Sequence, residues 1–173
     1  LFKQRRVVWG YAAAGPDVHN APQQKAHHMP TDALTILAVP VFSPLCNLGF
    51  ALRREVFIVE QQIPEAEEFD QADLAATHFV AIKDGAVVGT IRLQVFPEHV
   101  KIGRVVVAAA WRGHGIAKAM MLHVMGLARA EGAERFYLTA QVDKLGFYQR
   151  LGFVEFGEQF DDGGIPHLAM KTY

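Results

Sequence analysis

The chain has 173 residues, of which 51% are hydrophobic and 20% charged, and its formal net charge is −1. This length corresponds to one domain with a single core. The near-zero charge provides neither a basic field for nucleic acid nor a polybasic patch for a membrane surface, so we expect neither partner. The single cysteine, Cys46, excludes an intrachain disulfide and a multi-cysteine zinc site.

Residues 1–33 are predicted to be a flexible N-terminal extension or a leader, because residues 10–33 mix Gly, Pro, Asn, Gln and His without periodicity. Residues 3–14 faintly resemble a secretory signal, but their apolar run contains Gly10 and Tyr11 and is weakly hydrophobic. We therefore expect a cytoplasmic protein. The sequence leaves open whether residues 1–28 are a leader, an added extension or an arm.

Residues 34–173 are predicted to form one folded domain. Ser43-Pro44 is a helix start signal, and apolar residues at spacings of three and four continue that helix to Pro64. Asp84-Gly85 between two apolar runs predicts a tight hairpin. In chain order we expect a strand at 35–41, a helix at 44–63, strands at 77–83, 86–96 and 100–107, a helix at 112–131, a strand at 136–140, a helix at 144–151, and strands at 153–160 and 166–172. This order predicts an α/β (α+β) domain with a mixed, mostly antiparallel sheet.

The segment Arg112-Gly113-His114-Gly115-Ile116-Ala117 follows a buried strand and begins a long helix. Helix N-termini present unpaired N–H groups and a partial positive charge, which bind phosphate oxygens. Gly113 and Gly115 let the backbone approach an anion closely, and Arg112 adds a permanent cation. A lone Gly-x-Gly is equally compatible with a tight turn, and neither a Rossmann nor a P-loop fingerprint is present.

Two motifs together make a family resemblance specific. Arg112, Gly115 and Ala117 fill the places of the Gln/Arg-x-x-Gly-x-Gly/Ala cofactor loop of the GNAT N-acetyltransferase superfamily. Residues 147–153 resemble its C-terminal Phe-Tyr-x-x-x-Gly-Phe element, and the strand order is also similar. The resemblance covers about residues 34–173 and implies a GNAT-type single domain whose sheet is flanked by helices and whose central strand pair splays apart.

The resemblance implies acetyl-CoA as co-substrate. Backbone groups of the strand before the loop would pair with pantetheine, and the loop amides would hold the pyrophosphate. Gln141 matches a place from which the family contacts the pantetheine arm, although a solvent-facing glutamine at a strand end is an equal alternative. The implied cofactor-binding residues are Val105, Val106, Val107, Arg112, Gly113, His114, Gly115, Ile116, Ala117 and Gln141.

Tyr148, within the C-terminal motif, is the predicted general acid. Attack of an amine on a thioester expels a CoA thiolate, and a positioned phenol can donate a proton to it. On the residue type alone, a tyrosine with its ring in the core and its hydroxyl at the surface would be favoured. The surrounding motif favours the catalytic role.

The general base is not evident. Many family members place a glutamate early in the central strand, where this sequence reads Lys101-Ile102-Gly103-Arg104. Glu60 and Gln61 lie where the family forms its acceptor pocket, so Glu60 is the first candidate for the base or for an acceptor-pocket residue. Further candidates for the base are Asp70, His78 and His167, each with a structural role as the alternative. Candidate substrate-binding residues are Gln61, His78 and His167.

Two further segments, 56–61 and 164–170, resemble ElaA-like small bacterial acetyltransferases, a branch of largely undefined substrate. The eight histidines show no His-Glu-x-x-His or Cys/His spacing, so we expect no metal.

The leading hypothesis is acetyl transfer from CoA to a primary amine of a small molecule or peptide by direct attack, in a monomer or homodimer. The alternatives are transfer of a longer acyl group and a non-catalytic CoA-binding sensor or partner-binding module. Tyr148 and the intact loop favour catalysis, whereas the missing base favours the non-catalytic module.

Overall fold

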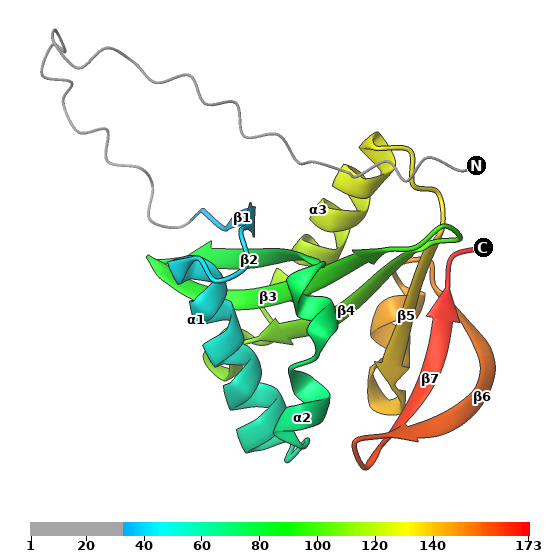
Figure 1. The fold of residues 1–173 in the computed structure, drawn as a ribbon. Coiled ribbons are helices and arrows are strands. Elements are labelled where there is room, and N and C mark those ends of the chain that lie inside the picture. Colours follow the sequence, from blue (N-terminus) through cyan, green and yellow to red (C-terminus); the bar gives the residue numbers. More distant parts are fainter. Residues whose placement is uncertain (1–32) are drawn as a thin grey trace, which may run out of the picture.

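The computed structural model describes residues 33–173, and the predictions for residues 1–32 lie outside this range. Seven strands form one sheet in the spatial order β1-β2-β3-β4-β5-β7-β6 (Figure 1). The strands are β1 (Thr35–Val39), β2 (Thr77–Lys83), β3 (Ala86–Val95), β4 (Val100–Val107), β5 (Phe136–Gln141), β6 (Val154–Asp162) and β7 (Ile165–Lys171). The helices are α1 (Pro44–Arg53), α2 (Glu65–Glu68), α3 (Ile116–Ala130) and α4 (Leu145–Gln149), with a π-helix η1 (Arg54–Glu60) and 3-10 turns η2 (Gln71–Leu74), η3 (Ala109–Trp111) and η4 (Val142–Lys144).

Neighbouring strands run antiparallel except for β4 and β5, which are parallel. The predicted mixed, mostly antiparallel α/β sheet is therefore confirmed. The Asp84-Gly85 turn joins β2 to β3 as expected, with φ values of 51° and 76° that suit a two-residue hairpin. Parallel strands need a crossover connection, and α3 provides it between β4 and β5.

Helices cover both faces of the sheet (Figure 1). On one face, α3 buries Met120 and Val124 in the main core, together with Phe79 of β2. On the other face, α1 packs through Cys46 against Val80, the residue after Phe79. Successive strand residues point to opposite faces, so Phe79 and Val80 each contribute to the core on one face of the sheet.

The predicted helix over 44–63 has a different internal geometry. It ends as an α-helix at Arg53 and continues as the π-helix η1. Leu48 and Val59, two of the apolar residues at spacings of three and four from which the helix was predicted, are 54% and 63% exposed. The face that packs on the sheet is centred instead on Gly49, where an added Cβ would lie 3.3 Å from atoms of Thr90 and Val80. The small residue lets the helix approach the sheet closely, and Val59 lies in the π-helix, whose wider turn departs from the α-helical spacing on which the prediction was based.

The helix α3 begins at Ile116, four residues later than the predicted Arg112. Gly113 and Gly115 have φ values of 81° and 76°, in the left-handed region that interrupts a right-handed helix and that glycine adopts without strain. Within residues 33–173, no helix is both long enough and apolar enough to cross a membrane.

Candidate active site

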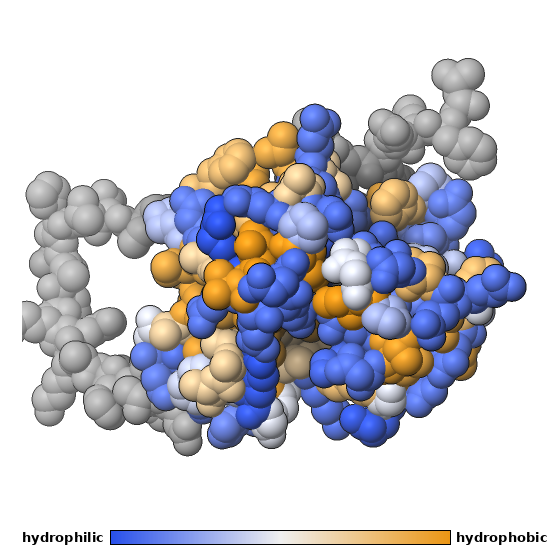
Figure 2. Space-filling model, turned by 90° about the horizontal axis from the view of Figure 1, so that it is seen from below, coloured by the Kyte–Doolittle hydropathy of each residue, from blue (hydrophilic) through white to orange (hydrophobic). Residues whose placement is uncertain are grey.

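A cleft opens between β4 and β5, in the middle of the sheet. These strands pair only at Val100–Phe136 and Lys101–Tyr137, so the facing edge of β4 beyond Lys101 has no strand partner. A cavity of about 400 Å³ lies in the gap, with walls from η1, β4, β5, α4 and the loop before α3. Seen from below, apolar surface gathers near the centre of the molecule and hydrophilic residues surround it (Figure 2). The expected splayed strand pair is confirmed.

The divergence of the two strands follows an irregularity in β4. The register between β3 and β4 shifts between Thr90 and Arg92, and Arg104 near this point has a φ of 53°. For a residue with a side chain, this conformation costs about 1 kcal/mol. The Arg104 guanidinium offsets the cost by donating to the backbone carbonyls of Glu67 and Glu68, at 2.8 and 3.1 Å. Such a bulge increases the local twist, which turns β4 away from β5.

Behind this bulge lies a buried ion network that the sequence did not predict. The guanidinium of Arg53, fully buried, donates to Glu68 at 2.5 Å and to both carboxylate oxygens of Asp73 at 2.9 and 3.0 Å. Arg92 donates to Asp73 and also to Asp70. The network fixes α1 and the α2–η2 segment against β3. The acidic run 65–73 was the available signal, but charge runs usually indicate exposed faces.

The predicted cofactor loop lies at one end of the cleft. Gly113, His114 and Gly115 are exposed, and the first N–H groups of α3 have no partner within the helix. The cavity is also lined by Ala117 and by Val105 to Val107, on the open edge of β4. Backbone donors therefore face the cleft region from two elements, an arrangement that suits an anionic group joined to a polar chain.

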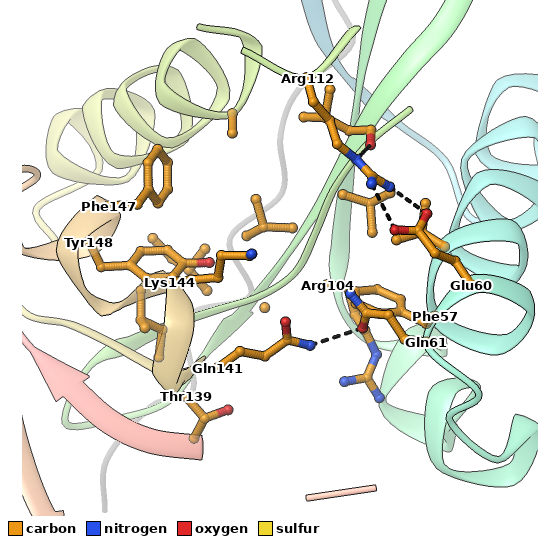
Figure 3. A pocket seen from close by; sticks show the side chains of 18 residues that line it. Phe57, Glu60, Gln61, Arg104, Arg112, Thr139, Gln141, Lys144, Phe147 and Tyr148 are labelled. Atoms are coloured by element: carbon orange, nitrogen blue, oxygen red, sulfur yellow. Dashed lines mark hydrogen bonds and ion pairs between the residues drawn. The ribbon is translucent and has the colours of Figure 1, made fainter. Parts of the chain in front are cut away.

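The side chain of Arg112 does not extend toward these amides. Its Nη1 and Nη2 donate to the two carboxylate oxygens of Glu60 at 2.7 and 2.6 Å, and its Nε donates to the Val107 carbonyl at 3.2 Å (Figure 3). The hydrogen bonds from Arg112 lower the pKa of Glu60. Glu60 is thus an ionised carboxylate on the cavity wall, joined to the predicted cofactor loop through Arg112.

The next residue, Gln61, makes a second contact across the cleft. Nε2 of Gln141, at the end of β5, donates to Oε1 of Gln61 at 2.9 Å (Figure 3). Glu60 and Gln61 together therefore connect the end of η1 to both the α3 loop and β5. Both side chains line the cavity, where the sequence had placed an acceptor pocket.

Tyr148 lies on α4, on the wall opposite Glu60, and its hydroxyl points into the cavity (Figure 3). Its ring packs edge-on against Phe147 and Phe153. Burial raises the pKa of Tyr148 to about 12. The ring thus has the structural role that its residue type suggests, while the hydroxyl remains available to the cleft.

The other candidates for the base lie outside the cavity. The Nε2–H of His78 donates to the Asp73 carbonyl at 2.8 Å, and burial lowers the pKa of this imidazole. Asp70 belongs to the ion network, and His167 stacks on Phe160. Of the four candidates, Glu60 is the one that lines the cavity. In residues 33–173, no group of three or more His, Cys, Asp or Glu side chains is placed to hold a metal ion.

Sequence comparison identifies the family. The sequence model of the Acetyltransferase (GNAT) family matches residues 49–153. This chain belongs to the GNAT acetyltransferase family. The uncharacterized N-acetyltransferase YjcF of Bacillus subtilis is 34% identical over 123 residues, which cover 70% of this chain and 88% of YjcF. Membership of this family supports acyl transfer as the activity.

Solved structures agree with this assignment. An acyl-CoA N-acyltransferase from Pseudomonas aeruginosa superposes with a TM-score of 0.72 and 31% identity, covering 82% of this chain and 99% of that one. Escherichia coli ElaA superposes with a TM-score of 0.72 and 29% identity, with the same coverage. The predicted resemblance to the ElaA-like branch is therefore confirmed.

Proposed function

We propose that this GNAT protein is an acetyl-CoA-dependent N-acetyltransferase that transfers acetyl to a primary amine of a small molecule or peptide by direct attack. The observation that carries the proposal is the β4–β5 cleft, with a helix N-terminus at one end and the Tyr148 hydroxyl on its wall. Two similar proteins, the uncharacterized N-acetyltransferase YjcF and the acyl-CoA N-acyltransferase of Pseudomonas aeruginosa, are named for transfer to nitrogen, which supports the proposal.

The residues at the cleft fit CoA. The amides of residues 113–117 would hold the pyrophosphate, because they combine unpaired N–H groups with the positive end of the α3 dipole. Val105 to Val107 would pair with the pantetheine arm, since the open edge of β4 carries backbone groups without a strand partner. Gln141 lies across the cleft from that edge and would contribute its amide.

The chemistry requires two proton movements. The amine nitrogen attacks the thioester carbon, so a C–N bond forms while the C–S bond breaks and CoA leaves as a thiolate. Tyr148 would donate its proton or a hydrogen bond to that thiolate, because its raised pKa keeps the phenol protonated. The ammonium group of the acceptor must lose a proton before attack, and Glu60 would accept that proton, directly or through water.

The test is a CoA titration followed by a screen of primary amines with acetyl-CoA, detected by thiol release. Micromolar CoA binding and amine-dependent thiol release are expected. Absence of CoA binding would contradict the proposal, and binding without turnover on any amine would favour the sensor alternative. Comparing acetyl-CoA with octanoyl-CoA on one active amine distinguishes acetyl transfer from longer acyl transfer.

A further inference from the structure

The ion pair between Arg112 and Glu60 joins the loop before α3 to the end of η1. Arg112 directly precedes the loop whose amides would hold the pyrophosphate, and Glu60 ends the π-helix that borders the predicted acceptor pocket. Both side chains are exposed, at 44% and 45%, and both line the cavity. An ion pair this exposed has a small net free energy and can be exchanged for another partner.

Two anions would therefore adjoin the same guanidinium when CoA is bound. One is the Glu60 carboxylate, at 2.6 Å, and the other is the pyrophosphate on the neighbouring amides. A guanidinium pairs with phosphate as readily as with a carboxylate, through the same two parallel donors. The other charged groups close to this pair are Lys144 on η4, which attracts Glu60, and Glu55 on η1, which attracts Arg112.

We propose that Glu60 and the cofactor pyrophosphate compete for Arg112, so that acyl-CoA binding releases the Glu60 carboxylate to bind the protonated amine of the acceptor. This inference rests on the proposed function, because it requires CoA to bind at the 113–117 loop. The acceptor would then be an amine that binds in its protonated, cationic form. Acyl-CoA would bind before the acceptor, because its pyrophosphate must first release Glu60. The free enzyme has this carboxylate already neutralised by Arg112 and so attracts the acceptor weakly.

The first test measures CoA affinity by calorimetry in three proteins. Glu60→Gln removes the competing charge and leaves Arg112 free for the pyrophosphate, so it should bind CoA about two- to fivefold more tightly, the range expected for an exposed ion pair. Glu55→Gln is the matched control, because it removes a nearby negative charge that makes no hydrogen bond to Arg112. Its CoA affinity should equal that of the parent.

An affinity of Glu60→Gln equal to or below that of Glu55→Gln would overturn the competition, because Arg112 would then serve only to hold η1 in place. Absence of CoA binding in all three proteins would instead overturn the proposed function. Thermal midpoints of the three should agree, since both glutamates are exposed.

The second test uses an amine found active in the screen. Glu60→Gln should raise the KM for that amine at least tenfold and lower the KM for acetyl-CoA. A structural role for the ion pair would move both KM values in the same direction, and that result would contradict the inference.

Discussion

The ring of Tyr148 packs against Phe147 and Phe153 while its hydroxyl points into the cleft, and burial raises the pKa of this phenol to about 12. The phenol is therefore protonated throughout the neutral range and can act as a donor but not as a base. A departing thiolate has a conjugate thiol with an ordinary pKa near 8.5, so complete proton transfer from this phenol would be uphill, and the hydroxyl would stabilise the thiolate by donating a hydrogen bond.

Tyr148→Phe separates the two roles of this side chain. The substitution keeps the ring packing and removes only the proton donor, so CoA affinity should change little while turnover falls by about 10²–10⁴-fold. A tyrosine with a purely structural role would keep its rate. Turnover and thermal midpoint, measured beside the parent protein, distinguish these results.

Gly115→Glu tests the anion site. A glutamate there would direct negative charge at the pyrophosphate, so CoA binding should be lost. Gly85→Glu is the matched control, because Gly85 has the same φ of 76° and the same open surroundings but lies in the β2–β3 turn. Both variants should lose similar stability, and only the first should lose CoA affinity. Equal CoA affinities would remove the cofactor assignment.

At the scale of secondary structure, the ion network behind β4 holds α1 and the acidic segment in place. Arg53→Met would leave the buried carboxylates of Glu68 and Asp73 without their main partner, so the free energy of unfolding should fall by about 3–5 kcal/mol. Arg54→Met is the control, because the adjacent Arg54 pairs with Glu65 at the surface. This substitution should lower the free energy of unfolding by less than about 1 kcal/mol. Urea denaturation measures both, and similar losses would contradict a buried network.

We expect the stability of the protein to depend on pH through His78, which contacts the same ion network. Burial lowers the pKa of His78 from its ordinary 6.5, so below that pH the unfolded chain takes up a proton that the folded protein does not. Stability should therefore fall as the pH drops from about 7 to about 5. His78→Gln keeps a donor for the Asp73 carbonyl and does not titrate, so its unfolding free energy should fall less steeply. Parallel profiles would exclude His78 as the cause.

The parts predicted from sequence were those with local signals. Asp84-Gly85 identified the β2–β3 hairpin, and the loop and Phe-Tyr motifs placed residues 112–117 and Tyr148 on the cavity or at its end. The π-helix, the bulge at Arg104 and the ion network depend on distant contacts. Arg112 and Glu60, for example, are 52 residues apart, and periodicity cannot indicate such a pair.

At the scale of the whole molecule, residues 1–28 are predicted to be dispensable. The sheet begins with β1 at Thr35, and those residues show no periodicity in the sequence. Their deletion should leave the thermal midpoint and CoA affinity nearly unchanged. A loss of several degrees would mean that the segment packs on the domain.

The sheet has two blocks, β1–β4 and β5–β7–β6. Between them, β4 and β5 pair only at Val100–Phe136 and Lys101–Tyr137, at one end of the cleft. A rotation of one block against the other about the Lys101–Tyr137 pair would displace the far end of β4 most. Since a strand rises about 3.3 Å per residue, Val107 is about 20 Å from that pair, and a rotation of about 5° would shift it by about 2 Å. Substitutions that change the strand twist near Lys101 would therefore be expected to change the width of the opening more than their own size suggests.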